Sequence, residues 1–155
     1  MCRIIKIGLK LPAVLTLLFV LAMFSIEATC IECRIDTAFS AVIADIMFIF
    51  SAFIIAYACF LFWREKTTAN PIKPENASTL VTTGIYSISR NPMYLGFLSI
   101  LMASAFLFSN FINFLLLPLF VFLVNKMYIR GEEKALASIF GNEFIAYKSK
   151  VRRWI

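Results

Sequence analysis

The longest uncharged stretch of the chain limits its fold more than any other feature. Positions 92 to 125 form 34 consecutive residues without a charged side chain. As one helix this stretch would extend roughly 50 Å, well beyond the ~30 Å hydrocarbon core of a bilayer. The stretch must therefore turn back on itself, and Ser109 and Asn110 are its only adjacent polar pair. We predict a helical hairpin there, with helices over about 92–109 and 111–129.

Two further apolar runs precede this hairpin. The first, from Leu11 to Ile26, predicts a retained helix over about 9–27, because the segment after it lacks the small residues of a signal-peptide cleavage site. The second, from Thr37 to Trp63, is interrupted only by Asp45 and predicts a helix over about 38–63. Hydrophobic residues make up 61% of the chain, which is too apolar for a water-soluble domain of this length.

These runs predict an all-α, polytopic membrane protein with about four transmembrane helices, forming a single membrane domain over 1–155. The region 64–91 changes to a polar composition with two Pro, which indicates a structured loop. The tail, 130–155, has apolar residues at three- and four-residue spacing between Lys and Arg. This spacing predicts an amphipathic helix lying at the membrane interface, divided at Gly141.

The basic residues indicate how the chain is oriented. Three Lys or Arg precede the first helix, one follows it, four lie between the second and third helices, none lies at the hairpin tip and seven follow position 125. The positive-inside rule then places both termini and the middle loop in the cytoplasm. The net charge of +6 is explained by this pattern and by anionic lipid headgroups. No nucleic-acid-binding motif accompanies it, so we expect the lipid bilayer and no nucleic acid as a partner.

A dense cluster of special residues, TTGIYSISRNPMYLG at 82–96, precedes the third helix. Taken alone, these residues favour a structural role. Asn91 is a preferred N-cap, Pro92 suits the first helical position, and Arg90 has the length to reach lipid headgroups.

A second cluster, YIRGEEKALASIFGNEFIAYKSKVRRWI at 128–155, begins where the fourth helix leaves the membrane. It puts Glu132 and Glu133 within a turn of the boundary, in the most basic part of the chain. Cations are favoured there, although a solvated helix start also tolerates Glu.

The two clusters together contain five short motifs in a fixed order. The matching residues are Leu80, Val81, Gly84 and Tyr86; Arg90, Pro92, Tyr94 and Gly96; Glu132, Glu133 and Leu136; Phe140, Gly141, Glu143 and Phe144; and Tyr147, Val151 and Arg152. This order, with a membrane hairpin after the second motif, resembles the isoprenylcysteine carboxyl methyltransferases and the related phospholipid methyltransferases. Those families are integral membrane enzymes that use S-adenosylmethionine. The resemblance covers about half of the chain.

The resemblance implies a membrane methyltransferase acting on a lipid-like acceptor, such as a prenylcysteine-type carboxylate or another small lipophilic substrate. It also implies that the methyl donor lies between the loop before the hairpin and the acidic turn after it. The residues carried over for donor binding are Thr79, Leu80, Val81, Tyr86, Asn91, Pro92, Met93, Tyr94 and Glu132. Arg130 and Glu133 are candidates for a catalytic role, and no metal is required.

Two positions depart from the family pattern. Asn91 stands where the family has a His, and an amide cannot accept a proton near neutral pH. Tyr128 stands where the prenylcysteine enzymes have a substrate-contacting Arg. Since a carboxylate nucleophile needs no base whereas an ammonium must first lose a proton, the first departure favours a carboxylate or thiol acceptor.

Three other functions stay open at this point. One is a phospholipid amine N-methyltransferase. Another is a family member that binds lipid or a partner helix without catalysis. The third is a membrane thiol-disulfide protein that uses Cys30 and Cys33, which form a CxxC between the first two helices, although a structural disulfide explains that pair more simply.

Overall fold

The computed structural model of the chain describes residues 12–29, 39–65 and 79–155. Regular structure within these ranges is helical, which confirms the predicted all-α class. Cys30, Cys33 and residues 66–78 of the polar loop predicted at 64–91 lie outside the described residues, as do the first residues of the helix predicted at 9–27.

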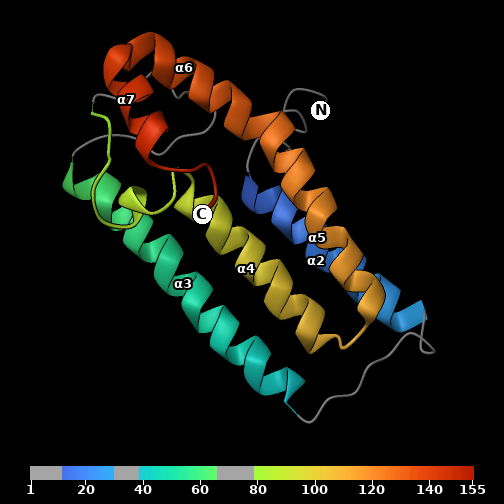
Figure 1. Cartoon of the computed structure of the whole chain (residues 1–155). Coiled ribbons are helices and arrows are strands. Elements are labelled where there is room, and N and C mark those ends of the chain that lie inside the picture. The colour runs from blue at the N-terminus through green and yellow to red at the C-terminus, as the bar shows by residue number, and fades with distance from the viewer. Residues whose placement is uncertain (1–11, 30–38, 66–78) are drawn as a thin grey trace, which may run out of the picture.

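Four apolar helices form the body of the molecule. They are α2 (Pro12–Thr29), α3 (Ser40–Arg64), α4 (Pro92–Leu107) and α5 (Phe111–Val124), shown in Figure 1. Within the described ranges, three stretches are long and apolar enough to cross a membrane, namely α2, α3 and the continuous helical region Phe111–Phe140. With the shorter apolar helix α4, they form the polytopic membrane protein expected from the sequence.

Helix α4 is the central element, because it packs against α2, α3 and α5. Its closest approach is to α3, where the Ser51 hydroxyl donates to the carbonyl of Gly96 at 2.8 Å. A Cβ on Gly96 would lie 2.5 Å from Cγ1 of Ile55, so the missing side chain is what permits this approach.

Large apolar side chains cover the outer faces of the helices, as lipid contact requires; exposed examples are Leu21, Phe24, Ile49, Phe53, Leu115 and Phe122.

The predicted hairpin between α4 and α5 is confirmed at Ser109 and Asn110. Ser109 has a positive φ of 48°, which reverses the chain. The side chain of Asn110 accepts a hydrogen bond from the backbone N–H of Ile112 at 3.1 Å. This contact caps the first turn of α5.

Helix α5 continues through a π-helical turn, η4 (Asn125–Ile129), into α6 (Arg130–Phe140). The part from Phe111 to Ile129 would extend about 28 Å, which nearly equals the ~30 Å core of a bilayer. The charged helix α6 therefore begins where the hydrocarbon ends.

The tail predicted at 130–155 forms two helices, α6 and α7 (Asn142–Lys150), divided at Gly141 as predicted. Gly141 adopts a φ of 50° and ends α6, because few other residues tolerate a positive φ. Helix α7 then runs back toward the bundle, and Phe144 and Tyr147 are buried on its inner face.

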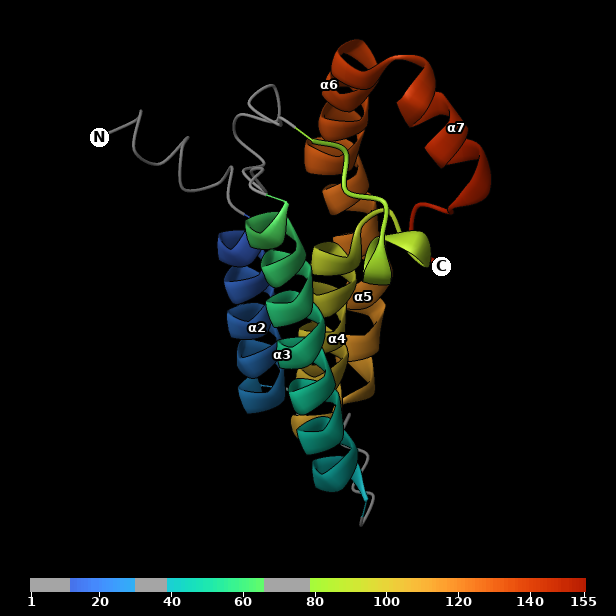
Figure 2. The same cartoon turned by 90° about the vertical axis from the view of Figure 1, so that its left-hand side faces the viewer.

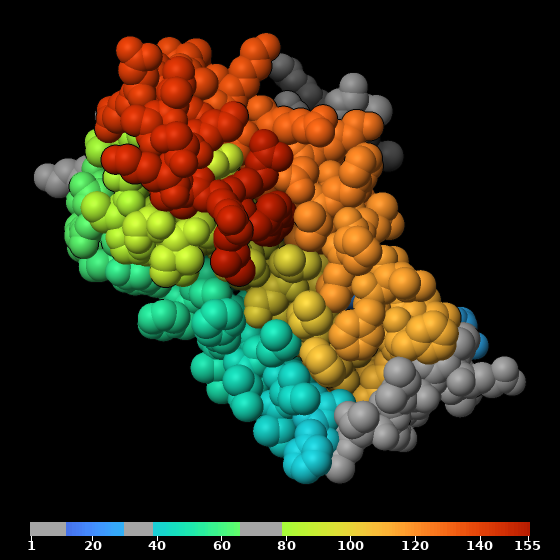
Figure 3. Space-filling model, viewed as in Figure 1, coloured from blue at the N-terminus to red at the C-terminus, as the bar shows by residue number. Residues whose placement is uncertain are grey.

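The last residues of the chain return to the start of α4. Figures 1 and 2 show the C-terminus beside the short 3-10 helix η3 (Gly84–Ser87). In the space-filling view the red C-terminal segment and the yellow-green segment around η3 cover the same end of the bundle (Figure 3). This end, which we call the polar end, carries the motifs that the sequence singled out.

Candidate functional site

The polar end is built on backbone contacts between residues 89–91 and residues 151–153. The backbone N–H of Arg90 donates to the carbonyl of Arg152 at 3.0 Å, and the guanidinium of Arg90 donates to the carbonyl of Val151 at 2.6 Å. These bonds hold the C-terminal segment across the first turn of α4. Two motifs that are some 60 residues apart in the sequence thus become neighbours.

Asn91 takes part in the same contact. It occupies the N-cap position of α4, but its side chain caps no backbone N–H of that helix. Its amide Nδ2 instead donates to the carbonyl of Arg153 at 3.0 Å. Asn91 therefore lies at the predicted N-cap position, but the predicted capping hydrogen bond is wrong, because the side-chain amide binds the C-terminal segment instead. Pro92 occupies the first helical position, as the sequence predicted.

An ion-pair network lies directly beneath these contacts. Glu133 Oε1 accepts from Arg90 Nη2 at 2.6 Å, and Glu133 Oε2 accepts from Arg153 Nη2, also at 2.6 Å. The Arg90 and Glu133 side chains are only 8% and 12% exposed. Arg90 therefore points into the protein, and the prediction that it reaches lipid headgroups is wrong. Its guanidinium balances the charge of the Glu133 carboxylate, which has little contact with solvent.

Burial by itself would raise the pKa of the Glu133 carboxyl. The hydrogen bonds from Arg153 and Arg90 outweigh this effect and hold the pKa below its usual range. Glu133 is therefore ionised near neutral pH, and both of its oxygens are occupied. In this state it organises the polar end and has no free oxygen to act as a base.

The neighbouring carboxylate, Glu132, is in a different environment. Its Oε1 accepts a hydrogen bond of 2.5 Å from the hydroxyl of Tyr94, which lies in the first turn of α4. Tyr94 also stacks on Tyr128, with ring centroids 6.1 Å apart. Burial raises the pKa of Glu132 to about 7, although the bond from Tyr94 opposes the shift. Glu132 is thus poised to change its charge near neutral pH, as ligand-binding carboxylates often are.

A second group of predicted residues packs beside this pair. Val81 and Tyr86 are buried in a cluster with Ala58 and Leu61 of α3, and Met93 packs against it. The hydroxyl of Tyr147 donates to the carbonyl of Tyr86 at 2.6 Å, which ties η3 to α7.

Burial raises the pKa of both tyrosines of this contact, that of Tyr147 to about 12. The two phenols therefore stay neutral. The Tyr147 hydroxyl acts as a hydrogen-bond donor, and the Tyr86 ring packs in the cluster. Leu80 packs against the buried face of α7, whereas Thr79 is exposed.

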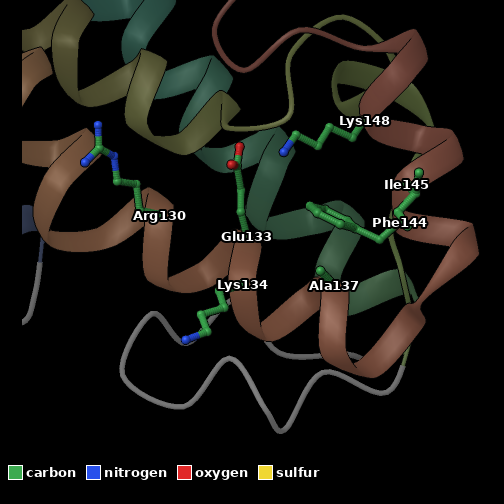
Figure 4. A pocket seen from close by; sticks show the side chains of 7 residues that line it. All are labelled: Arg130, Glu133, Lys134, Ala137, Phe144, Ile145 and Lys148. Atoms are coloured by element: carbon green, nitrogen blue, oxygen red, sulfur yellow. The ribbon is translucent and has the colours of Figure 1, made fainter.

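The two candidates for a catalytic role are not brought together in one contact. The Arg130 side chain is exposed, and it lines a hollow of about 300 Å³ between α6 and α7 together with Glu133 (Figure 4). Lys134 and Lys148 also line it, with Ala137, Phe144 and Ile145 as its apolar part. The figure shows Arg130 at one end of this hollow and Lys148 at the other.

Two residues of the polar end, Arg153 and Trp154, were missed from the sequence. Arg153 closes the Glu133 network and also donates to the amide oxygen of Asn125 at 3.3 Å. Trp154 packs against the core cluster that contains Tyr94 and Tyr128. The Arg-Arg-Trp run at 152–154 has the composition of an ordinary topogenic and interfacial segment, so nothing in the sequence marked Arg153 and Trp154 as contacts of the polar end.

Among the described residues, two buried N–H groups at the polar end have no hydrogen-bond partner, namely Nε of Arg90 and Nε1 of Trp154. Leaving such a donor unpaired costs about 1–3 kcal/mol. Unpaired buried donors are uncommon in folded proteins, so each calls for an explanation. One explanation is a bound ligand whose oxygen atoms accept hydrogen bonds from these two N–H groups.

Comparison with known proteins identifies a matching family and several similar proteins. A family model described as phospholipid methyltransferase matches residues 39–143. Protein-S-isoprenylcysteine O-methyltransferase of Saccharomyces cerevisiae is 43% identical over 82 residues, which are 51% of this chain and 33% of that protein. The enzyme of the same name from Schizosaccharomyces pombe is 38% identical over 72 residues, 46% of this chain and 30% of its own length.

An uncharacterised protein of Haemophilus influenzae is 41% identical over 63 residues, which are 41% of this chain and the whole of that protein. No solved structure matches the chain significantly. The alignments span about a third of the length of each yeast relative.

Proposed function

The chain belongs to the phospholipid methyltransferase family, and on that premise we propose that it transfers a methyl group from S-adenosylmethionine to a lipid-like acceptor in the membrane. The observation that carries this proposal is the contact between Tyr94 and Glu132. It joins the loop before the hairpin to the acidic turn after it. These are the two segments expected to hold the methyl donor.

The chemistry of the polar end fits that donor. S-adenosylmethionine, when bound, supplies a methyl group on a sulfonium, and it also carries a cationic amino group and an anionic carboxylate. Glu132 offers a half-buried carboxylate for a cationic group. The amino terminus of α4 and the unpaired Nε of Arg90 offer donors for the carboxylate.

We assign donor binding to the residues named from the sequence, with Glu132, Tyr94 and Asn91 as its polar members and Leu80, Val81, Tyr86, Pro92 and Met93 as its apolar wall. Thr79 marks the edge of this set, since its side chain is exposed. Glu133 holds Arg90 and Arg153 in place and does not react. Arg130, which lines one end of the hollow, is the remaining candidate for a contact with an anionic acceptor.

The transfer itself requires placement more than acid-base chemistry. An acceptor oxygen forms a bond to the methyl carbon while the methyl–sulfur bond breaks and its electron pair stays on sulfur. The protein contributes alignment and the exclusion of water, which together account for much of such a rate. A carboxylate acceptor needs no base. A carboxylate acceptor is therefore compatible with Asn91, which is no base and whose amide is already bound to the C-terminal segment.

A second candidate is methylation of a phospholipid amine, and one observation favours it. A carboxyl with a pKa of about 7, as in Glu132, is able to accept the proton that an ammonium must lose. The same carboxylate would then have to serve both the donor and the acceptor. We therefore place this function behind carboxylate methylation.

We further propose that the polar end faces the cytoplasm. It carries most of the basic residues of the described chain, including Arg64, Arg90, Lys148, Lys150 and Arg152, as the positive-inside rule expects for that side. A lipophilic acceptor would reach it from the inner leaflet.

One assay distinguishes these functions. The purified chain in lipid nanodiscs is given donor with a radiolabelled methyl group, together with total membrane lipids and an S-prenylated N-acetylcysteine. Carboxylate methylation predicts label that alkali releases as methanol, because esters hydrolyse and N-methyl groups do not. Alkali-stable label in phospholipid headgroups would support the second candidate instead. Absence of any labelled product would contradict both.

A further inference from the structure

Trp154 is the one aromatic side chain of the C-terminal segment, and the fold holds it tightly. The carbonyl of the preceding residue, Arg153, accepts hydrogen bonds from Asn91 Nδ2 at 3.0 Å and from the hydroxyl of Ser89 at 3.4 Å. The side chain of Arg153 is bound to Glu133. With the backbone fixed on both counts, the indole has little freedom to move away from the bundle.

The indole packs on the same core cluster as Tyr94, Tyr128 and Ile129. These residues belong to the first turn of α4 and to η4, which lie at the level where Arg153 is anchored. Trp154 is therefore a neighbour of the Tyr94–Glu132 pair in the fold, although 22 positions separate it from Glu132 in the sequence.

The N–H of this indole is buried and makes no hydrogen bond within the part of the chain that the structure describes. Tryptophan usually finds a partner for its N–H when it is buried, because the group donates and cannot accept. An apolar position in this cluster would be filled more simply by Phe, which has no N–H to satisfy. A Trp is explained if an oxygen atom from a bound molecule completes the bond.

We propose that Trp154 binds the methyl acceptor, with its indole N–H donating to an anionic oxygen at the reacting end and its ring flanking the apolar part. This inference rests on the proposed function. The nearby charges agree with an anion, since the guanidinium groups of Arg90 and Arg153 lie in the same layer. An ammonium headgroup would meet donors and positive charge and would gain nothing from the N–H.

The chain offers a direct spectroscopic test because it has two Trp residues. The other, Trp63, is 76% exposed near the end of α3. In a Trp63→Phe variant, Trp154 is the sole indole fluorophore. Addition of an S-prenylated N-acetylcysteine should shift or quench its emission. N-acetyl-S-prenylcysteamine, which lacks the carboxyl group, should have a much smaller effect at equal concentration.

A kinetic test uses Trp154→Phe, which keeps a ring and removes the N–H. We expect the KM for the S-prenylated N-acetylcysteine to rise about tenfold or more, as for a lost hydrogen bond to a charged group, while the KM for S-adenosylmethionine stays within about twofold. Trp63→Phe should leave both values unchanged. A purely structural role of Trp154 would instead lower activity without this split between the two substrates.

The outcomes separate this inference from the function on which it rests. The role of Trp154 alone is overturned if the emission of the Trp63→Phe variant does not change on addition of the acceptor. It is also overturned if Trp154→Phe transfers methyl groups with an unchanged KM for the acceptor. No methyl transfer by the wild-type chain overturns the proposed function and the role of Trp154 with it. Calorimetric titration of S-adenosylmethionine against Trp154→Phe shows whether that variant is folded.

Discussion

Arg90 and Glu133 are joined by a 2.6 Å ion pair that links the segment just before α4 to α6. The pair spans 43 positions of sequence, and Arg153 binds the other oxygen of the same carboxylate. Three separate segments are thereby fixed at one carboxylate. The Tyr94–Glu132 contact depends on this arrangement, because Glu132 is the neighbour of Glu133 on α6.

The first prediction concerns this network. Glu133→Ala leaves two guanidinium groups without their carboxylate, and breaking a buried pair from one side costs about 3–5 kcal/mol. Because Arg153 is one-third exposed, water screens part of that loss, and we expect the free energy of unfolding to fall by about 2–3 kcal/mol. Thermal unfolding in detergent measures it. Glu143→Ala, at an exposed position of α7, is the matched control and should change little.

A second prediction compares two glycines. Gly96→Ala places a Cβ 2.5 Å from Ile55 in the tightest contact between α3 and α4, and overpacking of this kind costs about 1–3 kcal/mol. Gly131→Ala on α6 meets no atom within 4 Å, and the gain in helix propensity is about 0.5–1 kcal/mol. The melting temperature should thus fall for the first variant and rise slightly for the second. Equal effects of the two substitutions would argue against close packing at Gly96.

A third prediction follows from the charge of Glu132. Its pKa is about 7 in the free protein, and only the ionised form pairs with a cationic group of the donor. Donor binding should therefore strengthen as the pH rises through 7. Between about pH 6 and pH 8 the ionised fraction increases from about a tenth to about nine-tenths, so kcat/KM for the donor should rise nearly tenfold and then level off. A profile that falls over this range would contradict the assigned role.

Local pattern was sufficient for the framework of this fold. The hairpin at Ser109 and Asn110 follows from the length of the uncharged run, which cannot be one transmembrane helix. The break at Gly141 follows from the need for a positive φ. Both depend on residues close together in sequence, where periodicity and turn chemistry are informative.

The contacts of the polar end could not be predicted in the same way. Asn91 was expected to cap α4, and Arg90 was expected at lipid headgroups, because both expectations used only neighbouring residues. In the fold each side chain binds the returning C-terminal segment, some 60 positions away. The environments of Glu132 and Glu133 differ for the same reason, since one meets a tyrosine of α4 and the other meets two arginines.

The resemblance to known methyltransferases supplied what the residues alone could not. It selected Tyr94 before the hairpin turn and Glu132 after it, 38 positions apart in the sequence, and their side chains are in contact. Trp154 was outside that selection, since it follows the last matched motif.

The central claim is that Glu132 holds the methyl donor at the polar end. Calorimetric titration of S-adenosylmethionine into the chain in lipid nanodiscs, at a pH of about 8, tests it most directly. The wild type should bind one donor per chain, and Glu132→Gln should bind at least about tenfold more weakly, since a hydrogen bond to a charged group contributes about 1.5–3 kcal/mol. Equal affinity of the two proteins, or no binding by the wild type, would contradict the account.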